Sequence, residues 1–153
     1  MYSREQSAVI RQNFWTRFGK YMSPIPSASG EKANWVNYKT GISQLYFRMN
    51  ASKEEAYIGI EMQQRNPVQS ATVLHQFALL RPMLEAELVE TWIWEQSFLN
   101  ENGQTISRIY TTLNGVNIFN ETDWPAIISF LKPRMLALDN FWAEHKMIFE
   151  IIA

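Results

Sequence analysis

The sequence contains no cysteine among its 153 residues. This absence excludes disulfide bonds, thiolate zinc sites, iron–sulfur clusters and cysteine nucleophiles. A chain of this length that is 46% hydrophobic is long enough to bury its own core and too apolar to be intrinsically disordered. We therefore expect one folded domain over residues 1–153, held together without disulfides or a structural metal.

The sequence also lacks a strong charge of one sign and long apolar runs. Its formal net charge is −1, which gives no general attraction to nucleic acid or to an anionic membrane. No apolar run approaches the roughly 20 residues that span a bilayer. The first ten residues do not form the apolar stretch of a signal peptide, because they include Arg4, Glu5 and Gln6. We expect a cytoplasmic protein with no membrane partner.

Common catalytic motifs are missing as well. Neither His75 nor His145 has a second metal ligand four residues further on, and there is no phosphate-binding glycine loop or nucleophile elbow. Glu61 and Glu95 could hold a divalent ion in a nuclease, but the restriction-type pattern needs a lysine two positions later. Gln63 and Ser97 stand there instead. The sequence thus offers no catalytic residue, no metal ligand and no cofactor site.

Apolar residues at steps of three and four predict three helices. The first covers roughly residues 3–22, with Ser3 and Gln6 spaced as a capping box. The second begins at Asn66-Pro67, a favourable N-cap and first helical residue, and the third begins near Thr122. Pro82 and Pro133 are expected to kink the second and third helices.

Alternation with a period of two predicts strands over residues 45–49, 57–62, 92–98 and 106–113, and a shorter strand over 35–39. Asn102-Gly103 favours a type I′ turn. The order is α-β-β-β-α-β-β-α. It predicts an α+β domain with two layers: a largely antiparallel sheet of about five strands, and helices on one of its faces.

The polar face of this sheet is the best candidate site. If the alternate apolar residues point toward the helices, the residues between them share the opposite face. Ile93 and Ser97 also fall on that face. The candidate binding residues are Tyr46, Arg48, Tyr57, Glu61, Glu95, Arg108 and Tyr110. The alternative is a solvated face with cross-strand ion pairs, each contributing roughly 0.2–1 kcal/mol.

Several short motifs follow one another in a characteristic order. They are Phe14-Trp15-x-x-Phe18, Trp35 to Gly41, Ile58-Gly59-Ile60-Glu61, Leu84-Glu85-Ala86-Glu87-Leu88, Trp94-Glu95, Ser107-Arg108-Ile109 and Asp123-Trp124-Pro125. Together they resemble an uncharacterised bacterial and archaeal domain-of-unknown-function family. Its members occur alone or as the C-terminal part of longer proteins, some with a nuclease-like N-terminal domain. The resemblance covers nearly the whole chain and implies no catalytic residue.

We therefore expect an interaction module without catalytic activity, which uses the polar sheet face to bind a protein or a small molecule. The alternative is a divalent-metal-dependent enzyme acting on nucleic acid. A basic first segment, with six Lys and Arg against two Glu in residues 1–39, leaves nucleic acid open as a partner. The many aromatic residues are compatible with a symmetric homodimer.

Overall fold

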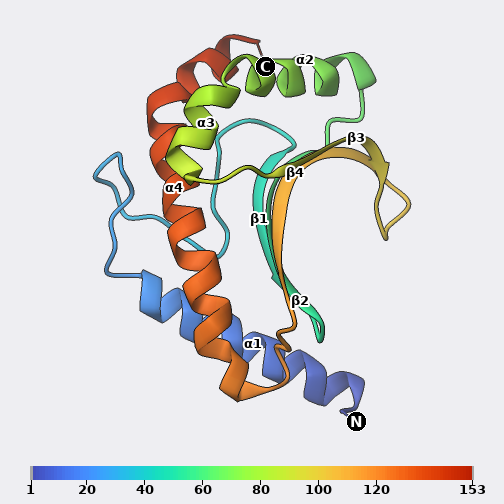
Figure 1. Cartoon of the computed structure of the whole chain (residues 1–153), viewed down its shortest axis with the longest axis vertical. Coiled ribbons are helices and arrows are strands. Elements are labelled where there is room, and N and C mark those ends of the chain that lie inside the picture. The colour runs from blue at the N-terminus through green and yellow to red at the C-terminus, as the bar shows by residue number, and fades with distance from the viewer. Residues whose placement is uncertain (1, 153) are drawn as a thin grey trace.

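The computed structural model describes residues 2–152 as one antiparallel sheet with helices packed on one side of it (Figure 1). The sheet has four strands in the order β1-β2-β4-β3. The elements are α1 (Arg4–Met22), β1 (Leu45–Ala51), β2 (Glu55–Met62), α2 (Pro67–Leu79), α3 (Arg81–Leu88), β3 (Ile93–Leu99), β4 (Thr105–Asn114), a short 3-10 helix η1 (Glu121–Asp123) and α4 (Trp124–Ile152). The fold is α+β, as the sequence predicts. None of the helices described is long and apolar enough to cross a membrane.

The hydrophobic core lies between the sheet and the helices. Strand residues such as Leu45, Ile58, Ile60 and Ile109 are almost completely buried there, as the alternation predicts. The sheet bends strongly, so that its other face is concave and turned away from α1 and α4 (Figure 1). We call this second face the concave face.

The predicted helix starts are confirmed. Ser3 and Gln6 form the capping box of α1, and the side chain of Asn66 accepts hydrogen bonds from the backbone N–H groups of Val68 and Gln69. These caps satisfy N–H groups that have no partner inside a helix.

The predicted short strand over residues 35–39 is wrong, and the sheet has four strands rather than five. This segment belongs to the loop between α1 and β1, and its side chains hold it against other elements. The Tyr38 hydroxyl donates to Asp139 of α4, and the Trp142 indole N–H donates to the carbonyl of Thr40. Because these contacts fasten the segment to α4, its backbone does not pair with β1.

The two helix prolines occupy different positions in their helices. The predicted second helix is broken at Leu80 into α2 and α3, and Pro82 lies in the first turn of α3, where its missing N–H costs little. In contrast, α4 continues through Pro133 without interruption. Buried residues on both sides of it, Leu131 and Met135, hold the helix against the core.

The hairpin of β3 and β4 forms as predicted, but two details differ. Gly103 has a positive φ of 73° and Asn102 does not, so the turn is not type I′. A β-bulge also interrupts β3 between Glu95 and Phe98. The bulge breaks the predicted alternation, since Ser97 adopts a φ of 56° and donates its N–H to Ser107.

Candidate functional site

The structure places all seven candidate residues on the concave face. Tyr46, Glu61, Arg108 and Glu95 form one cross-strand row that spans all four strands. The next row contains Arg48, Gly59, Tyr110 and Ile93, and Tyr57 lies in the third row, between Asn50 and Thr112. Among the residues that alternation assigns to this face, Ser97 is the exception, because it lies in the bulge of β3.

Arg108 lies at the centre of the concave face and is held by aromatic rings. Its guanidinium carbon is 3.9 Å from the ring centre of Tyr110 and 4.1 Å from that of Phe98, which the bulge brings onto this face. Its Nη2 donates to Glu95 at 3.0 Å. The buried Nε of Arg108 has no hydrogen-bond partner within residues 2–152. The Arg108 side chain is therefore fixed in position before any ligand arrives.

Tyr57 forms the second half of this cluster. Its hydroxyl donates to Glu61 at 2.8 Å, and its ring stacks on Tyr110 with 5.5 Å between ring centres. To reach Glu61, the Tyr57 side chain lies over Gly59. A Cβ atom at Gly59 would approach the Tyr57 hydroxyl to 2.5 Å and the Cβ of Tyr110 to 2.9 Å. The glycine is thus required by the packing of the two tyrosines.

Tyr46 and Arg48 form the accessible margin of the concave face on β1. The guanidinium carbon of Arg48 is 4.4 Å from the ring centre of Tyr46. Its Nε lies 4.0 Å from Glu61, at the limit of an ion pair, and about half of its side chain is exposed. Arg48 is therefore the cation on this face that a partner can reach most easily.

The local electrostatics favour a charged Glu95 and neutral Tyr57 and Tyr110. The Tyr110 hydroxyl and then the Arg108 guanidinium hold the pKa of Glu95 below its usual value of 4.5. Burial and the nearby Glu61 carboxylate raise the pKa of Tyr57, and Glu95 raises that of Tyr110. The concave face therefore holds Arg48 and Arg108 together with Glu55, Glu61 and Glu95, and the phenols of Tyr57 and Tyr110 are neutral at neutral pH.

The two carboxylates of the alternative metal site, Glu61 and Glu95, are not adjacent in the structure. Glu61 and Glu95 lie on either side of Arg108 in the row, and their oxygens accept hydrogen bonds from Tyr57, Gln63 and Arg108. Within residues 2–152, no three His, Cys, Asp or Glu side chains lie together as a metal site.

The basic residues of α1 are partly occupied by the chain itself. The guanidinium of Arg11 lies over the ring of Phe119 and that of Arg17 over Trp124, at 5.0 and 4.7 Å. Arg17 also pairs with Glu121 at 3.2 Å.

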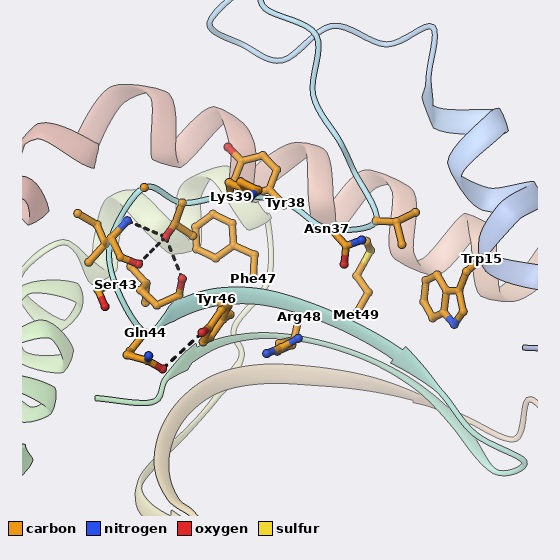
Figure 2. Close-up of a pocket in the computed structure, with 15 residues that line it drawn as sticks. Trp15, Asn37, Tyr38, Lys39, Ser43, Gln44, Tyr46, Phe47, Arg48 and Met49 are labelled. Atoms are coloured by element: carbon orange, nitrogen blue, oxygen red, sulfur yellow. Dashed lines mark hydrogen bonds between the residues drawn. The ribbon is translucent and has the colours of Figure 1, made fainter. Parts of the chain in front are cut away.

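A second feature, a groove beside β1, was not predicted from the sequence. We call it the edge groove. It has a volume of about 660 Å³ and is lined by Trp15 and residues 36–49. Figure 2 shows the segment with Asn37, Tyr38 and Lys39 passing along one side of β1, and Trp15 near Met49. No motif signals this groove, because it depends on the path of the loop between α1 and β1.

One buried carboxylate fixes the wall of the edge groove. Asp139 of α4 is 2% exposed and accepts hydrogen bonds from the Ser27 hydroxyl, the Ala28 N–H and the Tyr38 hydroxyl at 2.6–2.8 Å. The Tyr38 ring in turn stacks on Phe47 of β1. Burial and Asp139 together raise the pKa of Tyr38. Sequence reasoning missed Asp139 because nothing near it in the chain indicates its three distant partners.

Comparison with known proteins gives a family without an assigned activity. The model of the family described as domain of unknown function (DUF4268) matches residues 10–146, and the chain belongs to this family. Neither a curated protein nor a solved structure matches the chain.

Proposed function

We propose that this member of the DUF4268 family is a non-catalytic interaction module that holds a partner protein on the concave face. The single observation that supports this function most strongly is the position of Arg108, which is fixed by Tyr110, Phe98 and Glu95. Side chains that are already immobile lose little conformational freedom when a partner binds. Tyrosine and arginine are also the residue types that contribute most to protein interfaces.

The lack of excess positive charge on the concave face supports a protein partner rather than nucleic acid. Arg48 and Arg108 lie beside Glu61 and Glu95 on the same face, to which the register of β2 and β4 adds Glu55. A surface that binds a phosphate backbone carries a clear excess of positive charge. Exposed apolar surface at the margin of the face, such as Ile93 with 54% exposure, adds area that a partner can bury.

Site-specific cross-linking tests this function. A photoreactive amino acid at position 93, in the concave face, would be activated in the native lysate, and a matched one at the exposed position 68 on α2 serves as control. We expect a specific protein to cross-link at position 93 and not at position 68. The same products at both positions, or none at position 93, would contradict the proposal.

The identified partner then allows a quantitative test. Arg48→Ala should weaken its binding about tenfold, which corresponds to roughly 1.4 kcal/mol. The melting temperature should stay within about 2 °C, because Arg48 is half exposed and makes few contacts. Arg4→Ala, at an exposed position in α1, is the matched control and should bind like the wild type. Equal affinity of the Arg48→Ala variant and the wild type would count against the concave face.

The nuclease alternative is tested with labelled DNA and RNA, with and without Mg²⁺. Cleavage that is lost in Glu61→Gln would replace our proposal with that activity. We expect no cleavage, since the oxygens of Glu61 already accept hydrogen bonds from Tyr57 and Gln63.

A further inference from the structure

Strand β1 lies at the edge of the sheet, so one side of its backbone has no neighbouring strand. In an antiparallel pair, successive residues direct their N–H and C=O groups alternately toward and away from the partner strand. The N–H of Gln63 donates to the carbonyl of Gln44, and the N–H of Ser52 donates to that of Glu55. Even-numbered residues of β1 therefore point their backbone groups toward β2, and the odd-numbered residues point theirs outward.

Both ends of this outward edge are closed by the chain itself. The N–H of Leu45 donates to the carbonyl of Ile42, and its carbonyl accepts from the Thr40 hydroxyl. At the other end, the N–H of Ala51 donates to the side chain of Asn50, and its carbonyl accepts from Arg11.

The middle of the edge remains open. Phe47 and Met49 each direct one N–H and one C=O outward, and these four groups have no hydrogen-bond partner within the described part of the chain. Both residues are among those that line the edge groove, and the segment with Asn37, Tyr38 and Lys39 runs along this part of β1 (Figure 2). An extended backbone placed beside residues 47–49 would satisfy all four groups.

We propose that the edge groove binds an extended acidic peptide of a partner protein, which adds to the sheet as a fifth strand beside β1. This site shares Arg48 with the concave face. Strand addition depends on the backbone of Phe47 and Met49 and not on the Arg108 cluster, so it can be tested independently of the function proposed above. The backbone of the peptide supplies the hydrogen bonds, and its side chains supply the selectivity.

The chemistry of the groove defines the peptide. Lys39 and Arg48 are the charged residues among those that line it, and both are cations. In an antiparallel arrangement, the peptide residue opposite Arg48 shares its face of the sheet, so an acidic side chain there faces a cation. The residues on either side of it point the other way, toward the Trp15, Tyr38 and Met49 side of the groove. The structure thus favours an apolar–acidic–apolar sequence.

A second copy of this chain fits less well. When β1 strands of two copies pair antiparallel, the backbone groups of Phe47 in one copy can bond to those of Met49 in the other. In this register the two copies of Arg48 lie directly opposite each other. Like charges in that position destabilise a strand pair. In a self-pairing register that places the two copies of Phe47 opposite each other, Met49 would have to bond to Leu45 of the other copy. The outward groups of Leu45 already bond to Thr40 and Ile42.

Synthetic peptides test the proposal directly. The probe is a short capped peptide, Ser-Val-Glu-Val-Ser, added to the full chain while amide hydrogen exchange is followed by NMR. In the free protein the Phe47 and Met49 amides should exchange quickly and that of Arg48 slowly, because only the last bonds to β2. With the peptide, exchange at Phe47 and Met49 should slow by at least about tenfold.

Matched peptides separate the contributions of backbone and side chains. N-methylation of the two valines should abolish binding, because their N–H groups face β1, whereas N-methylation of the glutamate should not. Replacement of the central glutamate by lysine should weaken binding about tenfold. Equal binding of the valine-methylated peptide would overturn strand addition, and equal binding of the lysine peptide would overturn the acidic selectivity.

Two protein variants complete the test. Met49→Pro removes one outward donor without removing a bond to β2, and it should weaken peptide binding about tenfold relative to Met49→Ala. Arg108→Ala should leave peptide binding unchanged. A failure of the strand-addition proposal can therefore be distinguished from a failure of the function proposed for the concave face. Protection of Phe47 and Met49 that grows with protein concentration alone would show self-pairing instead, and absence of protection with every peptide would overturn the proposal.

Discussion

The concave face and the edge groove share strand β1 but differ in how their polar groups are satisfied. On the concave face, arginines, tyrosines and glutamates bond to one another, and the whole cluster depends on close packing around Gly59. In the edge groove, backbone groups of Phe47 and Met49 have no partner in the described chain. The concave face can offer a partner a preformed surface of aromatic rings and arginines. The edge groove can offer backbone donors and acceptors that are free to form hydrogen bonds.

The two surfaces also depend on different parts of the molecule. The concave face is built from four strands. The hairpins β1–β2 and β3–β4 each pair neighbouring segments of the chain, and β2 and β4 join the two hairpins into one sheet. The edge groove needs the loop between α1 and β1, which is held by the distant Asp139. Substitutions outside the shared Arg48, such as those at Asp139 or Gly59, should therefore damage one surface without damaging the other.

The largest effect is expected for Asp139→Ala. It leaves the Ser27 hydroxyl, the Ala28 N–H and the Tyr38 hydroxyl without their acceptor. The free energy of unfolding, measured in urea, should fall by about 3 kcal/mol. Hydrogen exchange should become faster over residues 27–40 and stay unchanged at Arg108 and Tyr110. Asn140→Ala, at the exposed neighbouring position, is the control, and a loss below about 1 kcal/mol would show that the groove wall does not depend on Asp139.

A smaller effect is expected for Gly59→Ala, which acts on the concave face. The added methyl group would collide with Tyr57 and Tyr110, so the free energy of unfolding should fall by about 2 kcal/mol. The matched control is Gly19→Ala in α1, where the nearest atom is 3.4 Å away and alanine favours the helix. That variant should be as stable as the wild type or more stable. Equal behaviour of the two variants would mean that the tyrosine cluster does not require a glycine.

The smallest effect is expected for the pH dependence of Glu95. Its folded pKa is lowered by Tyr110 and Arg108, so its charged form stabilises the fold at pH values above the usual 4.5. This contribution is lost as the pH falls from about 4.5 through the lower folded pKa. Glu95→Gln should therefore flatten the stability profile in acid, measured by urea unfolding at a series of pH values. Glu101→Gln, in the exposed hairpin loop, should keep the wild-type slope, and an unchanged slope in Glu95→Gln would refute this role.

The concave face could be predicted because alternation and hairpins are local signals. The spacing of Tyr46, Arg48, Tyr57 and Glu61 places them on one side of β1 and β2 whatever the rest of the chain does. The bulge in β3 escaped prediction, because Ser97 adopts its positive φ through a contact with Ser107 across the hairpin. The same bulge brings Phe98 against Arg108, which a strict period of two cannot indicate.

The edge groove could not be predicted, because it depends on contacts between residues far apart in the sequence. Residues 35–39 have the composition of a strand, but Tyr38 and Thr40 bond to Asp139 and Trp142, about a hundred positions further along the chain. Tertiary contacts of this kind override local propensity. For the same reason, the break at Leu80 and the continuity of α4 through Pro133 follow from packing rather than from the prolines alone.

The closed ends of the β1 edge have a consequence for solubility. Because Thr40, Ile42, Asn50 and Arg11 occupy the outward groups of Leu45 and Ala51, the open stretch is limited to Phe47, Arg48 and Met49. Segments that stack into cross-β fibrils are roughly six or seven residues long and carry little charge. A stretch of this length with an arginine at its centre can accept one strand from a partner without starting the open-ended stacking that makes exposed edges hazardous in a crowded cell.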